Sequence, residues 1–289
     1  RDGTISGLFE EKPLNYEGAV TAMLGQKLSQ SEIKINERKR EILNLKEVRL
    51  ASGSKPFDLS FFENEIVSST GLIGSGKTTL ASQIFGLDSN SKVKMTLNGN
   101  AYKPKSPKEA IAAGVFMCPK DRASNAVVSE FDISNNLALP FLKRHSRLSF
   151  LRSKSLAQNA RNSIDKLGIV CQSEMDSVTT LSGGNQQKVM VGRWLAEESS
   201  VLLLDEPFQG VDIKARRDIG IQIRSTSSQR ATLIFVAELD EALEIADRVI
   251  VLHEGNLVGE YQNKRKNIPE IVSSFSGSAY NQGSSNYGT

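Results

Sequence analysis

The chain has 289 residues, 39% of them hydrophobic, so it exceeds one average domain and can bury a sizeable core. Its 36 Lys and Arg residues nearly balance its 33 Asp and Glu residues, so charge alone does not indicate a nucleic-acid partner. Two cysteines without metal or redox spacing fit a reducing compartment, and no apolar run approaches the roughly 18 to 20 residues that cross a bilayer.

The beginning of the chain repeats a pattern found near its other end. Residues 1–7 (RDGTISG) and 253–259 (HEGNLVG) place an acid, a glycine, an aliphatic residue and a second glycine at matching positions. Each pattern predicts a tight turn, at Gly3 or Gly255, that leads into a short strand. We therefore expect residues 1–40 to hold the tail of a preceding copy of the same domain and a polar linker.

From residue 41 onward the pattern predicts strands and helices. Strand-like runs are expected at residues 42–50, 57–62 and 65–69, and a helix at residues 77–85. Between about residues 123 and 180 the pattern is helical, with residues 153–167 as the clearest helix. Strands then alternate with helices: strands at 201–204, 232–236 and 249–252, helices at 213–224 and 239–246. The alternation predicts parallel βαβ architecture, followed by a tail over residues 263–289.

A glycine-rich loop lies between a predicted strand and a predicted helix. Residues 71–78 (GLIGSGKT) satisfy the pattern G-x-x-x-x-G-K-[ST]. Its glycines let backbone N–H groups converge on one anion, to which the helix start adds positive charge. Lys77 would reach the β- and γ-phosphates of ATP, and the Thr78 hydroxyl would ligate Mg²⁺. The alternative is a glycine-rich turn that binds nothing. The nucleotide-binding residues expected here are Gly71, Leu72, Ile73, Gly74, Ser75, Gly76, Lys77, Thr78 and Thr79.

Two acids follow the continuous apolar run at residues 201–204, which predicts a parallel strand buried on both faces. Ligands of open α/β sheets gather at the carboxyl ends of strands, where Asp205 and Glu206 would lie. Asp205 is suited to hold Mg²⁺, and Glu206 to polarise the water that attacks the γ-phosphate. The alternative interpretation makes them helix-initiating acids before Pro207.

A second candidate anion site lies in the string LSGGNQQK at residues 181–188, which opens an apolar-periodic helix. Ser182, Gly183 and Gly184 would present backbone N–H groups at that helix start. One chain rarely needs two such sites for one triphosphate, so we expect this one to close the nucleotide of a facing copy. The alternative is an ordinary serine N-cap.

In this order, the three motifs resemble those of ATP-binding cassette ATPases over about residues 41–262. The resemblance implies an α/β fold: a P-loop NTPase cassette with a mixed β core, an antiparallel β subdomain and an α-helical subdomain inserted at about residues 123–180. The run 185–188 and the run 210–212 resemble the second cassette of the fused double ATPase of bacterial ribose/galactose-type monosaccharide importers.

That resemblance implies an ATP hydrolase coupled to sugar uptake. Its expected partners are a preceding cassette of the same polypeptide, membrane permease subunits and, indirectly, a periplasmic sugar-binding protein, with no nucleic acid. Its expected location is peripheral, on the cytoplasmic face of the inner membrane. The resemblance does not say which sugar is carried.

Two positions depart from the family pattern. Lys120 occupies the place of a glutamine that senses Mg²⁺, and Ala237 occupies the place of a switch histidine. The two histidines, His145 and His253, are expected at the surface. We therefore expect this cassette to turn ATP over slowly while Ser182 completes the partner's site. Two alternatives are a non-hydrolysing, nucleotide-gated dimerisation module and a soluble cassette protein acting on ribosomes or DNA; the charged segment 31–40 is short for the second.

Overall fold

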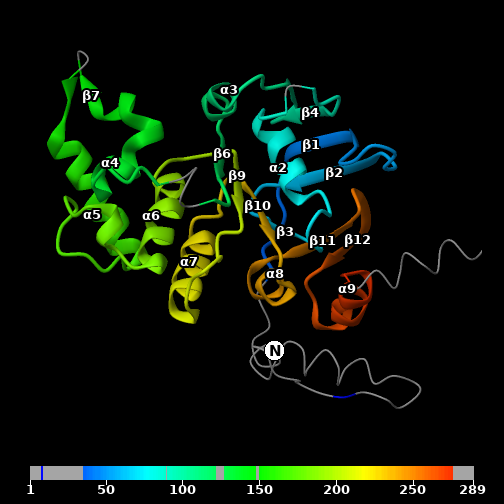
Figure 1. The fold of residues 1–289 in the computed structure, drawn as a ribbon. Coiled ribbons are helices and arrows are strands. Elements are labelled where there is room, and N and C mark those ends of the chain that lie inside the picture. The colour runs from blue at the N-terminus through cyan, green and yellow to red at the C-terminus, as the bar shows by residue number, and fades with distance from the viewer. Residues whose placement is uncertain (1–7, 9–34, 89, 122–126, 148–149, 276–289) are drawn as a thin grey trace, which may run out of the picture.

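The computed structural model describes residue 8 and residues 35–88, 90–121, 127–147 and 150–275. The expected turn at Gly3 lies outside these residues. The described chain forms two large sheets with a helix between them, and a largely helical segment with a two-stranded sheet at one end (Figure 1). None of the helices in the described ranges combines the length and the apolar character needed to cross a bilayer.

The central sheet has six strands in the order β12-β11-β3-β10-β9-β6. All neighbours pair in parallel except β11 and β12, which are antiparallel. Every residue of β3, β9 and β10 is buried, as expected of strands covered on both faces. The predicted βαβ architecture is confirmed. The strand bounds are β3 Ile66–Thr70, β6 Val115–Cys118, β9 Val201–Asp205, β10 Ala231–Val236, β11 Arg248–His253 and β12 Asn256–Gln262.

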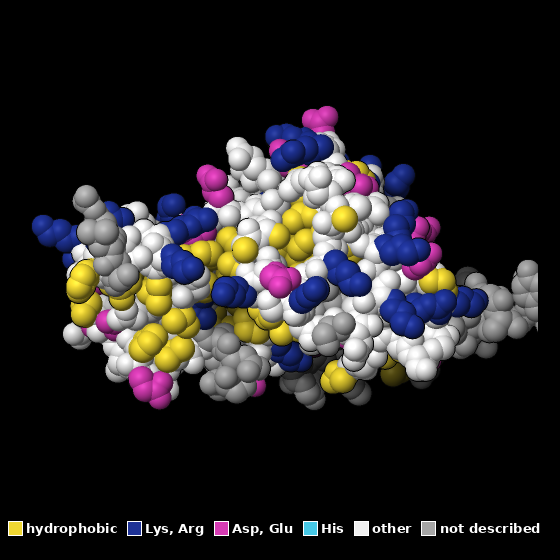
Figure 2. Space-filling model, turned by 90° about the horizontal axis from the view of Figure 1, so that it is seen from above, with side chains coloured by type: hydrophobic (Ala, Val, Ile, Leu, Met, Phe, Trp, Pro, Cys, Tyr) yellow, Lys and Arg dark blue, Asp and Glu magenta, His cyan; other side chains and the backbone are white. Residues whose placement is uncertain are grey.

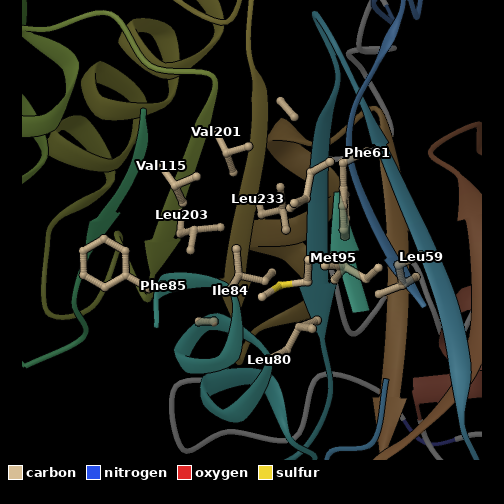
Figure 3. Packing of buried hydrophobic residues seen from close by; sticks show 14 of the residues in the cluster. Leu59, Phe61, Leu80, Ile84, Phe85, Met95, Val115, Val201, Leu203 and Leu233 are labelled. Carbon is tan, nitrogen blue, oxygen red and sulfur yellow. The ribbon is translucent and has the colours of Figure 1, made fainter. Parts of the chain in front are cut away.

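The second sheet is antiparallel, in the order β2-β1-β4-β5, and helix α2 (Lys77–Phe85) packs between the two sheets. Leu80 and Ile84 of α2 are fully buried against Leu203 of the central sheet and Met95 of the second sheet (Figure 3). Each such side chain stabilises the fold by about 1.5–3 kcal/mol. This packing fixes α2, and with it the loop that precedes it. The strands are β1 Glu41–Val48, β2 Phe57–Phe62, β4 Lys94–Leu97 and β5 Asn100–Tyr102.

The other face of the central sheet is covered by α6 (Gly183–Leu195), α7 (Ile213–Ser225), α8 (Leu239–Ile245) and α9 (Ile268–Phe275). Helix α9 falls in the range expected to be a tail, yet its Ile271 is fully buried. Its apolar residues recur at i, i+3, i+4 and i+7, which gives one helix face to pack on the sheet. The described fold therefore continues past residue 262.

The helical segment has its own small core, made by side chains of α4, α5 and α6. Its α5 spans Ser153–Leu167 as predicted, whereas the short hairpin of β7 and β8 was not expected. His145 is only 7% exposed, and its Nδ1 lies 2.9 Å from the Ser155 hydroxyl, so its predicted surface position is wrong. His145 is the last residue of a 3₁₀ helix that places its imidazole ring against α5. The remaining elements are α3 Pro107–Ala112, α4 Ile133–Ala138, η2 Leu139–His145, β7 Ser146–Arg147, β8 Phe150–Leu151, η3 Val178–Thr180 and η4 Arg265–Asn267.

Hydrophobic side chains gather among Lys and Arg at the end of the molecule formed by the helical segment (Figure 2). The exposed large hydrophobic residues of this segment are Phe131, Phe150, Leu151, Val170 and Met175. Exposed apolar groups that cluster rather than scatter are typical of a contact surface.

Two hairpins have the same kind of turn, made by two successive residues in the left-handed conformation. Asn98 and Gly99 join β4 to β5 with φ of 50° and 77°, and Glu254 and Gly255 join β11 to β12 with φ of 47° and 78°. Two successive left-handed residues form the turn whose twist matches paired strands. The tight turn predicted at Gly255 is confirmed.

Substituting Gly99 and Gly255 by alanine should separate the energetic cost of left-handed backbone strain from the cost of steric crowding. A Cβ at Gly99 meets nothing within 4 Å, so Gly99→Ala should cost about 1 kcal/mol of unfolding free energy through left-handed strain alone. A Cβ at Gly255 would lie 2.7 Å from the Cβ and 3.1 Å from the amide nitrogen of Ala51. Gly255→Ala should therefore cost about 1–2 kcal/mol more. Urea unfolding measures both; equal losses would contradict the close packing of this hairpin on Ala51.

Candidate functional site

The loop at residues 71–76 connects β3 to α2. Gly76 is the N-cap of α2 with φ of 103°, and no side chain caps the helix. A Cβ at Gly76 would meet the Leu50 side chain at 2.9 Å, so the position requires glycine on both counts. The first N–H groups of α2 therefore have neither an intrahelical partner nor a capping side chain, and they carry the positive end of the helix dipole. This arrangement is a cradle for an anion.

Lys77 lies at the mouth of this cradle and is only 8% exposed. Its Nζ donates to the Gly71 carbonyl at 2.5 Å and to the Leu72 carbonyl at 3.3 Å. Burial lowers the pKa of Lys77, while the nearby carboxylates of Glu206 and Asp205 oppose that change. An ammonium group held in this way can exchange carbonyl partners for phosphate oxygens.

The tip of the loop is exposed. Leu72 is 53% exposed and Ile73 is 98% exposed, so almost nothing in the fold packs against the Ile73 side chain. Ser75, in contrast, is buried, and its carbonyl accepts a hydrogen bond from the Gly255 N–H at 3.1 Å. The β11–β12 hairpin thus supports the loop from behind.

The sheet brings the second predicted motif to the same edge. Strand β10 lies between β3 and β9, and its Phe235 pairs with Ser69 on one side and Asp205 on the other. The carboxyl ends of the three strands therefore meet. The Thr78 hydroxyl donates to Asp205 Oδ2 at 3.3 Å, which joins the start of α2 to the end of β9. Two sequence motifs about 130 residues apart thus form one site, as expected where open sheets bind ligands.

The Asp205 carboxyl is 2% exposed. Burial raises its pKa to about 6, and Glu206 adds to this rise, while the hydrogen bond from Thr78 and the charges of Lys120 and Lys77 oppose it. An acid with a raised pKa is destabilised in its charged form, so a bound cation would relieve that cost.

Glu206 is held in a strained conformation. Its φ is 49°, and its N–H donates to the Phe235 carbonyl at 2.8 Å. Its Oε2 accepts from the Ala237 N–H at 3.2 Å. Ala237 lacks a side-chain donor, yet its backbone orients the predicted catalytic carboxylate. The sequence could not show this contact, because any residue except proline supplies the same N–H.

A cavity of about 680 Å³ opens at this edge of the sheet, and Thr78, Lys120 and Asp205 line it. Ser82 and Gln209 line it too, although the sequence analysis did not single them out. Ser82 follows Thr78 by one helical turn, a spacing that places both on one face of α2. In the described residues no three His, Cys, Asp or Glu side chains form a metal cluster. Mg²⁺ needs only one or two protein oxygens beside phosphate and water, so the Thr78 and Asp205 oxygens fit it.

The second predicted anion site lies apart from this cavity. Ser182 is the exposed N-cap of α6, and its Oγ accepts from the Asn185 N–H at 3.5 Å. The Asn185 side chain in turn accepts from the Val170 N–H at 3.0 Å, which ties the helix start to the segment that follows α5. Ser182, Gly183 and Gly184 do not line the cavity that holds Thr78 and Asp205. The chain therefore presents this helix start outward.

Together, the two sheets, the inserted helical segment and the loop between β3 and α2 define a P-loop ATP-binding cassette fold. A family model described as "ABC transporter" matches residues 54–209. The chain belongs to the ABC transporter family.

Known proteins of this family resemble the chain along most of its length. It is 33% identical over 264 residues to the "Arabinose import ATP-binding protein AraG" of Pectobacterium atrosepticum, a match that covers 90% of this chain and 52% of that protein. It is 34% identical over 281 residues to the "Ribose import ATP-binding protein RbsA 2" of Rubrobacter xylanophilus, covering 96% and 54%. The chain thus spans about half the length of these relatives.

Solved structures confirm the predicted fold class. The ADP conformation of MJ1267, an ATP-binding cassette of an ABC transporter, superposes with a TM-score of 0.69 at 20% sequence identity, covering 83% of this chain and 100% of that one. At this identity the likeness concerns the fold alone.

Neutralising Asp205 is expected to stabilise the ligand-free chain. The folded pKa of about 6 lies above the ordinary 3.8, so stability falls as pH rises between these values. Asp205→Asn should therefore raise the unfolding free energy by about 3 kcal/mol near pH 7.5 and by nearly nothing near pH 4. Urea unfolding at both pH values measures this. The exposed Asp165→Asn is the matched control, and a gain of equal size there would contradict the argument.

Proposed function

We propose that this chain binds Mg-ATP and serves as one half of a two-cassette ATPase that powers uptake of a simple sugar through a membrane permease. The hydrogen bond between Thr78 and Asp205, beside an uncapped glycine-rich loop, is the observation that carries the proposal. The names of the arabinose and ribose import relatives support the class of substrate.

The residues of the site suit this chemistry. Backbone N–H groups of residues 74–79 would donate to the phosphates, and Lys77 would exchange the Gly71 carbonyl for a phosphate oxygen. Thr78 and Asp205 would hold Mg²⁺, which when bound neutralises phosphate charge. Glu206, oriented by the Ala237 N–H, would accept a proton from the attacking water.

Two features support slow turnover at this site. Lys120 brings a cation, not a metal ligand, into the cavity, and Ala237 offers no side chain to a γ-phosphate. The intact helix start at Ser182 faces outward, where it would complete a site on another cassette. A non-hydrolysing, nucleotide-gated dimerisation module is the second candidate, because the same two positions favour it.

We further propose that the other cassette precedes this one in the same polypeptide. The relatives' length, about twice that of this chain, supports this arrangement. In it, residues 1–40 contain the tail of the first cassette and the linker. The second cassette, with its helical subdomain at about 123–180, begins at residue 41 and extends past residue 262 to include α9.

The exposed hydrophobic residues of the helical segment support docking to permease subunits at the cytoplasmic face of the inner membrane. A periplasmic sugar-binding protein would act through that permease. No nucleic-acid partner is proposed.

Lys77→Ala tests nucleotide binding directly. Isothermal titration calorimetry with Mg-ATP should show binding to the chain and a loss of roughly 100-fold in affinity in the variant, because a charge-assisted contact disappears from a buried site. Lys108→Ala, an exposed residue of α3, should bind like the parent chain. Unchanged affinity in a folded Lys77→Ala protein would contradict the proposed site.

Two substitutions at Ser182 test the outward-facing helix start. Asp and Asn both cap helices well, so stability should stay within about 0.5 kcal/mol in both variants. In the full-length polypeptide, Ser182→Asp should lower ATP turnover roughly 100-fold because its charge repels phosphate, while Ser182→Asn should have a much smaller effect. Nucleotide binding at the Lys77 site should not change.

Substituting the P-loop lysine of the partner cassette in the full-length polypeptide should abolish most turnover, whereas Lys77→Ala should spare most of it. Near-normal hydrolysis after loss of the partner's lysine would contradict the proposed asymmetry.

A further inference from the structure

A lysine other than Lys77, Lys120, lines the cavity that Thr78 and Asp205 also line. Strand β6 pairs in parallel with β9, with Cys118 opposite Leu204. Lys120 follows Cys118 by two residues and Asp205 follows Leu204 by one, so the pairing brings both to the same edge of the sheet. Both side chains line the cavity that Thr78 also lines.

The charge of Lys120 acts on both functional groups of the site. Burial and Glu206 raise the pKa of Asp205, and among the positive charges that oppose this rise Lys120 acts more strongly than Lys77. Burial lowers the pKa of Lys77, and the positive charge of Lys120 lowers it further. Because Lys120 lines one cavity with Thr78 and Asp205, its ammonium group lies near the place where phosphate and metal would meet.

The two lysines of the site differ in their partners. The Lys77 ammonium donates to carbonyls of its own loop. No hydrogen bond or ion pair joins the Lys120 side chain to any residue in the described ranges, and this side chain is exposed at the cavity wall. Its three donors are therefore available to an incoming ligand.

Charge balance gives Lys120 a role. Without it, Asp205, Glu206 and the cavity-lining Asp121 outweigh Lys77 by two negative charges, and a triphosphate adds several more. A bound divalent cation ordinarily offsets such an excess. With Lys120 the excess of negative charge falls from two to one. An ammonium group cannot ligate a metal, but it donates strong hydrogen bonds to phosphate oxygens.

We propose that Lys120 is a tethered cation that contacts the nucleotide's phosphates beside Thr78 and Asp205, so that this cassette binds ATP without requiring a divalent metal ion. The proposal rests on the proposed function, because it needs the nucleotide in this cavity. It adds that the site keeps its nucleotide when Mg²⁺ is scarce. The same charge competes with Mg²⁺ for Asp205, which suits a site that holds ATP more than it hydrolyses it.

Calorimetric titration of ATP with and without Mg²⁺, the latter in excess chelator, tests this role. The parent chain should bind metal-free ATP with an affinity within about tenfold of that for Mg-ATP. Lys120→Gln should weaken binding of metal-free ATP by a further factor of about ten, the size of one charge-assisted contact, while binding of Mg-ATP changes by less than about threefold. Lys108→Gln, on α3 at the opposite end of β6, is the matched control and should bind as the parent does.

The outcomes separate the two proposals. If the parent binds Mg-ATP but not metal-free ATP, the tethered-cation role is overturned and the proposed function stands. If Lys120→Gln binds metal-free ATP as well as the parent does, the role is also overturned. If the parent binds neither form, the proposed function itself fails. Lys120→Arg should retain metal-free binding, because it keeps the charge and the donors, and its loss would likewise contradict the role.

Discussion

The start of helix α2 is left uncapped at Gly76, one turn or less from Thr78, which lines the cavity together with Asp205. A side-chain cap at this position would stabilise a helix by about 1 kcal/mol, and α2 forgoes it. Burial of its apolar face between two sheets, through residues such as Leu80 and Ile84, more than offsets that loss. The open helix end is stable because the core behind it is dense, and the site depends on that packing.

The charges of the site conflict in the absence of a ligand. Asp205 has a raised pKa and Lys77 a lowered one, so burial disfavours the charged form of each. The charged forms of these two buried groups become more stable when phosphate and a cation replace the water that burial has removed. The same reasoning applies to the proposed role of Lys120: a further positive charge in the cavity lining would shift the balance between metal and nucleotide without adding a ligand oxygen.

The sequence was sufficient to predict those helices, strands and motifs whose signal lies within a short stretch of the chain. The helices at residues 77–85 and 153–167 were predicted to the residue, because the glycine-rich loop fixes the start of the first and Gly168 follows the last residue of the second. The buried strands were predicted because apolar runs covered on both faces are continuous. The P-loop, the acid pair and the helix start at Ser182 were recognisable because each motif lies within eight residues.

Other features depend on contacts between distant parts of the chain. Strands β7 and β8 have two residues each, too short for any periodicity. The burial of His145 requires the 3₁₀ turn that folds its ring onto α5. Helix α9 is packed because the sheet offers a surface to its apolar face. The N–H of Ala237 holds Glu206 only because β10 and β9 are neighbours.

Hydrogen exchange measured with and without Mg-ATP tests the central claim most directly. If the loop and the first turn of α2 cradle the phosphates, the amides of residues 74–79 should exchange markedly more slowly with nucleotide bound, while those at the start of α6 stay unchanged in this chain alone. Unchanged exchange at residues 74–79 under saturating nucleotide would show that the triphosphate binds elsewhere, and the account of this site would be wrong.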